Sequence, residues 1–219
     1  MLTLNSEIET LKGVGPALKK KLNACGVNLI EDLLFLLPYR YEDRTKLYPI
    51  ADAPHNERAL IAGRITDSKI LFYGRRSLSI TIEDETKKLK LRFFYFSNSQ
   101  FQQFKNNSHV ICYGTIRTDS KRTEMIHPEY RFINSKKELK GDETLTPIYS
   151  TIDGIQTGRL KNLIRQALNV MKTSKPQELF PKKILNDLKL PNLENALINL
   201  HQPPPQIDWS NTEDTLVKC

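Results

Sequence analysis

Apolar residues recur with helical spacing at both ends of the chain. Near the N-terminus, a glycine-rich turn at 11–16 leads into a predicted helix that begins at Pro16 and ends at Gly26. Asn28 followed by Glu31 is a capping-box pattern and predicts a second helix before Pro38. Towards the C-terminus, two further runs have helical spacing, namely Leu160, Leu163, Ile164, Ala167, Leu168 and Met171, then Leu193, Ala196, Leu197 and Leu200.

In the middle of the chain the apolar period changes to two, which predicts strands. The expected order is three strands, a short helix and two strands, at 59–70, 77–83, 89–96, 98–104, 110–116 and 123–132. This is the element order of an OB-fold, a five-stranded Greek-key barrel. Gly63 and Gly114 fall inside strands, where a small barrel bends sharply.

The predicted fold class is therefore α+β, a five-stranded OB-fold flanked by N-terminal helices and a C-terminal helical connector. The expected boundaries are a helical segment at 1–56, the barrel at 57–133, the connector at 134–205 and a tail at 206–219.

The third predicted strand carries the most informative side chains. Alternation places Leu89, Leu91, Phe93 and Tyr95 in the barrel interior, and points Lys90, Arg92, Phe94 and Phe96 the other way. Cations pair with phosphates and flat rings stack on unpaired bases, so a face that carries both suits a nucleic acid. The alternative is that Phe94 and Phe96 pack under a neighbouring domain.

The neighbouring predicted strand, at 77–83, and the loop that precedes it add to this face. Ser77, Ser79 and Thr81 are small and are expected to leave the neighbouring strand face open. The preceding loop contributes Tyr73, Arg75 and Arg76, at the hairpin loop where OB-folds hold their ligands.

The net charge of +8 also favours a polyanionic partner, although such an excess can belong to a solvated surface. The Gly13-Val14-Gly15 turn is similar to a helix-hairpin-helix turn, whose amides hold a phosphate. A tight turn that only joins two packed helices is the favoured reading of Gly13 and Gly15.

Catalytic chemistry has little support. The sequence has no GxxxxGK[ST] phosphate loop, and its histidines lack metal-ligand spacing, so no catalytic or metal residue is assigned. Glu83, Asp84 and Glu85 are expected to form a solvated acidic turn. Cys25 and Cys112 lie among apolar neighbours and are expected to be buried, and the third cysteine, Cys219, ends the chain.

Several strings resemble, in order, the N-terminal region of the RecG family of ATP-dependent helicases, which remodel stalled replication forks. They are LKGVGPAL (11–18), EDLLFLLPYRYEDRT (31–45), GRRSLSITIED (74–84), LRFFYFS (91–97), EMIHPEYR (124–131), LTPIYSTIDGI (145–155) and LPNLENALINLHQPP (190–204). The resemblance implies that the barrel is the wedge that meets the branch point of a fork. By motif, the wedge aromatics of the family map onto Phe93 and Phe94, and its basic pair onto Arg75 and Arg76. Phe94 is the residue on which alternation and resemblance agree.

The resemblance also implies partners and cofactors. Branched DNA, meaning forks and Holliday junctions, is the expected ligand, and the helicase lobes of a longer protein, absent from these 219 residues, are the expected protein partner. ATP and magnesium are expected only for those lobes, so the chain alone is expected to lack ATPase activity. An RNA-binding OB module and, less favoured, a metal-dependent nuclease built on Glu83, Asp84 and Glu85 are the alternatives. The chain is expected to be monomeric and, because it shows neither a secretory signal nor a membrane-length apolar run, cytoplasmic.

Overall fold

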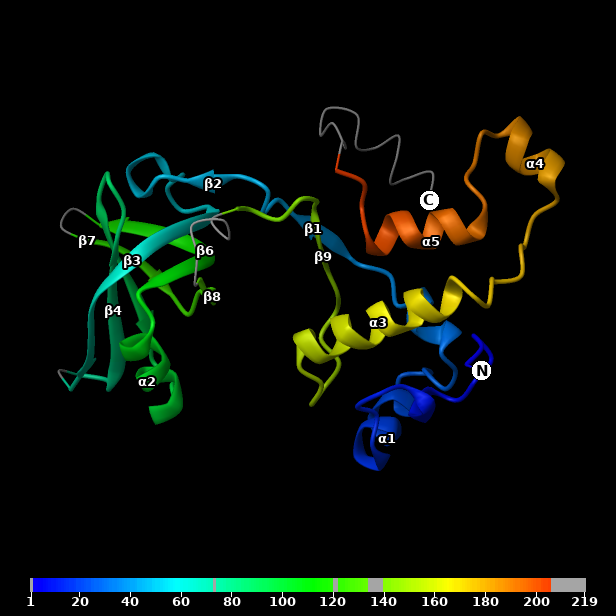
Figure 1. Cartoon of the computed structure of the whole chain (residues 1–219), viewed down its shortest axis with the longest axis horizontal. Helices are drawn as coiled ribbons and strands as arrows, with labels where there is room; N and C mark the ends of the chain where they lie inside the picture. Colours follow the sequence, from blue (N-terminus) through cyan, green and yellow to red (C-terminus); the bar gives the residue numbers. More distant parts are fainter. Residues whose placement is uncertain (1, 73, 120–121, 134–139, 206–219) are drawn as a thin grey trace. The chain divides into compact units, whose positions relative to one another are not determined.

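A computed structural model describes residues 2–72, 74–119, 122–133 and 140–205 of the chain (Figure 1). The chain divides into two compact units. Unit 1 comprises residues 1–42 and 144–219, and unit 2 comprises 43–143. Tyr73, Cys219 and the tail at 206–219, all named in the sequence predictions, lie outside the described residues.

Unit 2 is a closed five-stranded barrel. Its strands are β3 (Arg58–Leu71), β4 (Ser77–Glu83), β5 (Lys88–Phe93), β6 (His109–Asp119) and β7 (Arg122–Ile126). They pair in the order β3-β4-β5-β7-β6, and β6 closes the ring on β3. All of these pairs are antiparallel except β5 with β7. This pairing confirms the predicted OB-fold.

The barrel core comes from the predicted alternation. Leu89, Leu91 and Phe93 of β5 are buried with residues of the other strands and with Phe104 of α2 (Asn98–Asn106). The hydroxyl of Ser97 accepts a hydrogen bond from the Gln100 amide (3.1 Å) and so begins α2. Gly63 lies close to the paired strand β4, because a Cβ atom there would meet the Glu83 carbonyl oxygen at 3.0 Å, tighter than ordinary van der Waals contact.

The two differences from the predicted strands that affect the site lie at the same end of the barrel. β5 ends at Phe93, so residues 94–96 leave the ladder. The last predicted strand is divided at His127–Pro128 into β7 and β8 (Glu129–Ile133), and β8 pairs antiparallel with the first half of β6, at residues 109–113. A short β2 (Leu47–Tyr48) adds a parallel strand to β3, and η3 (Ile50–Asp52) follows it.

Unit 1 joins the two ends of the chain in one core. Its elements are η1 (Ile8–Thr10), α1 (Pro16–Ala24), η2 (Glu31–Phe35), β1 (Arg40–Glu42), β9 (Thr146–Ile148), α3 (Thr157–Met171), α4 (Lys182–Asp187) and α5 (Leu193–His201). The apolar stripe of α3 packs with buried leucines and isoleucines of the N-terminal segment, and β1 pairs with β9. The helical segments before and after the barrel therefore share a single hydrophobic core.

Two predictions in the N-terminal segment are wrong. The capping box at Asn28 does not form an α-helix, because η2 is a short 3₁₀ helix that begins at Glu31. Asp32, not Glu31, turns back and accepts hydrogen bonds from the amides of Asn28 and Leu29, both at 2.7 Å. Cys25, expected to be buried, is exposed at the C-cap of α1, whereas Cys112 is buried in the barrel as predicted.

A buried histidine links α5 to η2. The Nε2 atom of His201 lies 2.8 Å from the Leu34 carbonyl oxygen, and its Nδ1 atom lies 2.9 Å from the Tyr149 hydroxyl. Because a carbonyl oxygen only accepts, Nε2 carries the proton and Nδ1 accepts from Tyr149. Burial lowers the pKa of His201, against the opposing effect of the hydrogen bond to Leu34.

The lowered pKa of His201 predicts that unit 1 loses stability on acidification. Between pH 7.5 and pH 5.5 the unfolded chain binds a proton at this residue more readily than the folded chain, so the free energy of unfolding falls as the pH falls below the ordinary pKa of 6.5. Urea denaturation followed by helical circular dichroism at both pH values measures the fall. His201→Asn should make the pH dependence shallower, because it removes the buried imidazole that bonds Leu34 and Tyr149. An equal pH dependence in the His201 variant and the wild type would contradict the assignment.

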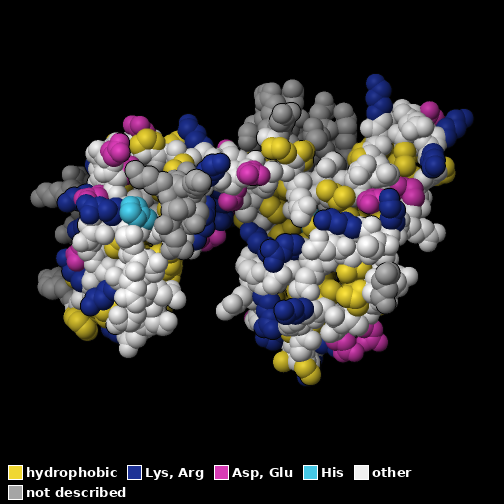
Figure 2. Space-filling model, viewed as in Figure 1, with side chains coloured by type: hydrophobic (Ala, Val, Ile, Leu, Met, Phe, Trp, Pro, Cys, Tyr) yellow, Lys and Arg dark blue, Asp and Glu magenta, His cyan; other side chains and the backbone are white. Residues whose placement is uncertain are grey.

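Apolar side chains are exposed around α4, where yellow atoms gather in Figure 2. The exposed residues are Leu179, Phe180, Ile184 and Leu188. Lys182 and Lys183 lie among them, so this part of unit 1 presents a mixed apolar and basic surface.

Candidate nucleic-acid interface

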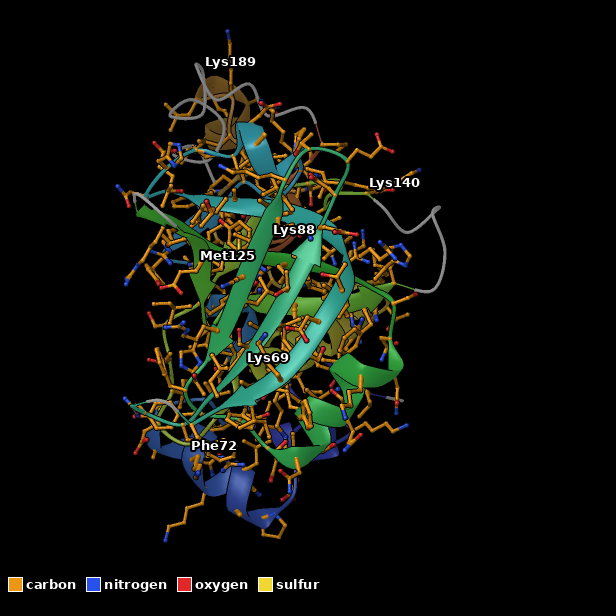
Figure 3. The ribbon with its side chains drawn as sticks, turned by 90° about the vertical axis from the view of Figure 1, so that its left-hand side faces the viewer. Lys69, Phe72, Lys88, Met125, Lys140 and Lys189 are labelled. Atoms are coloured by element: carbon orange, nitrogen blue, oxygen red, sulfur yellow. The ribbon has the colours of Figure 1, made fainter. Side chains whose placement is uncertain are left out.

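Three chain segments meet at one end of the barrel. Leu78 of β4 pairs with Phe93 of β5, so the loop that precedes β4 lies beside the residues that follow β5. β7 runs parallel to β5, so its end lies there as well. Figure 3 labels Phe72 at this end of the β3–β4 hairpin, away from Lys88 at the start of β5. Residues 72, 74–76, 94–96 and 127 are thus brought together at the ends of three different strands.

Aromatic rings and arginines pack against each other at this end. The His127 ring centroid lies 5.8 Å from the centroids of both Phe94 and Tyr95. The guanidinium of Arg75 lies 4.5 Å from the Tyr95 ring and 5.5 Å from the Phe94 ring, and that of Arg76 lies 4.6 Å from the Phe96 ring. We refer to Arg75, Arg76, Phe94, Tyr95, Phe96 and His127 together as the ring cluster.

Tyr95 is the most accessible of the three rings that follow β5, with 74% of its surface exposed. Strand alternation had placed it in the barrel interior, and that prediction is wrong because β5 ends two residues earlier. Phe94 is half-buried, and Phe96 is half-buried and packs against the barrel core. Phe72, at the tip of the β3–β4 hairpin, is 76% exposed.

Phe93 lies inside the barrel beneath the ring cluster. It is only 3% exposed, and its ring centroid lies 5.7 Å from Phe104, 5.6 Å from Tyr130 and 6.0 Å from His127. The alternation pattern predicted this interior position. A ring buried in this way offers no exposed face to a base.

The outward face of β4 and β5 is less open than the sequence suggested. Ser77 and Ser79 are buried, so they do not leave the surface free. The Nε atom of Arg92 lies 3.6 Å from a carboxylate oxygen of Glu124 on β7, and both side chains are largely covered. Lys90 is exposed on the same face and is therefore more accessible than Arg92.

The glycine turn of unit 1 is held by packing contacts. Gly13 has a φ angle of 94°, which favours glycine, and its carbonyl oxygen accepts a hydrogen bond from Arg159 of α3 (2.8 Å). The side-chain amide of Gln166 bonds both the N–H and the carbonyl of Lys12, at 3.0 and 3.1 Å. These contacts fix α1 against α3, as expected of a turn that joins packed helices, and Gly15 precedes the first residue of α1.

The acidic turn at 83–85 lies at the other end of β4, and the side chains of Asp84 and Glu83 are engaged in contacts within the barrel unit. The Asp84 carboxylate accepts from the amides of Ile50, Thr86 and Lys87. Burial acts to raise the pKa of Asp84, but these hydrogen bonds outweigh it and hold the pKa below its usual value. Glu83 pairs with Arg64 and Lys88. Within the described ranges, no group of three or more His, Cys, Asp or Glu side chains is arranged to hold a metal ion.

No helix among the described residues is both long enough and apolar enough to cross a membrane.

The chain thus contains an OB-fold with an aromatic and basic surface at one end of its barrel. Comparisons with known proteins place this chain in a family. The family described as the RecG wedge domain matches residues 7–171, and the chain belongs to that family.

Its relatives include the ATP-dependent DNA helicases RecG of Escherichia coli K12 and of Pasteurella multocida, each 37% identical over 206 residues, or 94% of this chain and 29% of the relative. RecG of Bacillus subtilis is 28% identical over 204 residues, or 90% of this chain and 28% of the relative. The chain thus spans less than a third of the length of these relatives.

A solved structure of RecG bound to a three-way DNA junction has the same fold. It superposes with a TM-score of 0.74 at 23% sequence identity, and the match covers 92% of this chain and 27% of that one.

Sequence reasoning missed two members of the ring cluster, Tyr95 and His127. Tyr95 was assigned to the wrong side because the end of β5 depends on its neighbour β7. His127 has no metal-ligand spacing and falls within a predicted strand, so nothing in the sequence singles it out beyond its place in the string EMIHPEYR. The proline after His127 was the available signal that the last strand breaks there.

Proposed function

We propose that this chain binds branched DNA as the wedge of a RecG-type helicase, with the ring cluster as its contact to exposed bases. The exposed Tyr95 ring, flanked by Arg75, is the observation that carries the proposal. A flat ring beside a cation matches the two needs of a DNA branch point, where a terminal base pair and phosphates lie close together. Phe94 keeps its predicted part in the contact, and Phe93 supports the cluster from below.

The basic residues have different parts in this proposal. Arg75, Arg76 and Lys90 are exposed and serve as the phosphate contacts. Arg92 faces Glu124 and contributes mainly by maintaining the β5–β7 surface. Tyr73 stays a candidate from the sequence alone. The turn at Gly13 and Gly15 is assigned to packing, because Arg159 and Gln166 already bond its backbone.

The rest of the expected assembly is proposed on the family relationship. RecG relatives are named as ATP-dependent helicases, so ATP, magnesium and hydrolysis are assigned to motor lobes of a longer protein, and none of them to these residues. The apolar surface around α4 suits a contact with such lobes, because exposed apolar patches commonly mark interfaces. We further propose a monomeric, cytoplasmic protein.

Binding measurements on the wild-type chain test the proposal. Fluorescence anisotropy with a three-way fork, a plain duplex of equal length and an RNA hairpin should give the tightest binding for the fork. Equal affinity for fork and duplex would contradict the wedge function. Tighter binding of the RNA hairpin would favour the alternative of an RNA-binding OB module.

The arginines of the ring cluster should set part of the salt dependence. Each phosphate contact contributes a slope of about −0.7 to −0.9 to a plot of log affinity against log salt concentration. Arg75→Ala with Arg76→Ala should therefore make the slope shallower by about one to two units. The matched control is Lys87→Ala with Lys88→Ala, which removes two exposed cations from the opposite end of β4 and β5 and should leave the slope nearly unchanged. Equal slopes for the wild type and the Arg75/Arg76 variant would show that neither arginine meets the DNA backbone.

A further inference from the structure

His127 occupies an unusual backbone position at the end of β7. Its φ angle is 48°, in the left-handed region that few residues other than glycine adopt. Its backbone N–H still donates to the Arg92 carbonyl oxygen (2.8 Å) and so extends the parallel pairing of β5 and β7 by one bond. The hydrogen-bonded ladder between β5 and β7 therefore continues up to the backbone N–H of His127, and the regular pattern of backbone bonds ends there.

The imidazole of His127 supplies the next hydrogen bond of the ladder. In a regular parallel pair, the residue whose N–H bonds Arg92 would accept the Phe94 N–H with its own carbonyl oxygen. Here Nε2 of His127 accepts from the Phe94 amide instead, at 3.2 Å. His127 thus bonds the backbone on both sides of Phe93, once through its own backbone and once through its ring.

The same ring touches the aromatic side chains that follow β5. Its centroid lies 6.0 Å from Phe93, edge-on, and 5.8 Å from Phe94 and from Tyr95. One side chain therefore fixes the main chain where β5 ends and also packs against the rings on either side of that point. Ordering these groups before binding reduces the conformational entropy lost when DNA binds.

We infer that His127 is the positioning residue of the ring cluster: its ring nitrogen anchors the Phe94 amide and thereby holds Phe94 and Tyr95 in the orientation that meets DNA. This inference rests on the proposed function for its consequence in DNA binding, but not for its structural part. The hydrogen bond requires Nε2 to be an acceptor, so the proton of the neutral ring is on Nδ1.

A matched pair of variants separates the anchoring bond from the ring contacts. His127→Phe keeps a ring and removes the acceptor, whereas His127→Gln keeps an acceptor and removes the ring. Both replace histidine at the same positive φ angle, so the backbone strain is comparable. His109→Phe is the control, because His109 is exposed on β6 and its Nδ1 atom lies 3.0 Å from the Ser108 hydroxyl, away from the ring cluster.

Amide hydrogen exchange at Phe94, measured by NMR, reads the anchoring bond directly. His127→Phe should speed exchange by about 2- to 13-fold, the effect expected from loss of one hydrogen bond, and His127→Gln should retain part of the protection. His109→Phe should leave exchange at Phe94 unchanged. Unchanged exchange in His127→Phe would overturn the inference.

The His127 imidazole of the wild-type protein gives a second readout, which does not require any variant to fold. Imidazole nitrogen shifts at pH 8 should identify the Nδ1–H tautomer of His127, and the Nε2–H tautomer would overturn the inference.

Fork affinity completes the test. Fork affinity should fall in His127→Phe and recover in part in His127→Gln. Equal fork affinity in His127→Phe and the wild type would show that His127 does not position the cluster for DNA. If Tyr95→Ala binds forks normally, the proposed function fails, but exchange at Phe94 still decides whether His127 anchors the chain.

Discussion

Replacing Tyr95 by Ala is expected to weaken fork binding by about 5- to 150-fold, because stacking of one base on an aromatic ring contributes about 1–3 kcal/mol. Tyr95 is 74% exposed and lies against Arg75 and His127, so it presents its ring without supporting the barrel core. The loss should be much smaller for a plain duplex, which exposes no branch-point base pair. Fluorescence anisotropy with both DNAs at one salt concentration measures the difference.

The matched control for Tyr95 is Tyr39, a second exposed tyrosine with an arginine nearby. The guanidinium of Arg40 lies 5.3 Å from the Tyr39 ring, but Tyr39 belongs to unit 1 and not to the ring cluster. Tyr39→Ala should bind forks as the wild type does, and both variants should melt close to the wild-type temperature. An equal loss in the two variants, or no loss in Tyr95→Ala, would contradict the role given to Tyr95.

Phe93→Ala is expected to destabilise the barrel by about 3–5 kcal/mol, the range for removing a phenylalanine ring from a packed core. Phe93 is 3% exposed and contacts Phe104 and Tyr130, so its loss leaves a cavity between β5 and α2. Urea denaturation followed by a probe in unit 2 measures the change in the free energy of unfolding.

The contrast between Phe93 and Tyr95 controls for a general effect on the fold. Phe93→Ala should lower stability strongly, whereas Tyr95→Ala should lower fork affinity with little change in stability. A Phe93 variant as stable as the wild type would mean that this ring is not part of the barrel core.

The barrel could be predicted from sequence because its strands are regular where they are buried. Leu89, Leu91 and Phe93 alternate as expected, and all three are in the core. The same alternation failed at Tyr95, because the end of β5 is set by its pairing with β7 and by the His127 ring. Such a tertiary contact leaves no periodic signal along the strand itself.

The helical unit was predicted less completely for a similar reason. The stripe of α3 correctly identified a buried face, but an apolar face does not specify its partner. Its partner is the N-terminal segment, more than a hundred residues away in the chain, as the contact of Arg159 with Gly13 illustrates. Before η2, Asp32 rather than Glu31 accepts hydrogen bonds from the free backbone amides of Asn28 and Leu29. The capping pattern in the sequence does not distinguish between these two adjacent acidic residues.

The most direct test of the account is whether the ring cluster stacks on the branch point of a fork. A fork with 2-aminopurine in the terminal base pair at the branch reports stacking through its fluorescence, and a second fork carries the same probe several base pairs away inside a duplex arm. Binding of the wild-type chain should change the fluorescence at the branch, and Tyr95→Ala should abolish that change at saturating protein. The probe inside the arm should respond to neither protein. A branch-point signal that is the same for the wild type and Tyr95→Ala would contradict the central claim that this surface is the wedge.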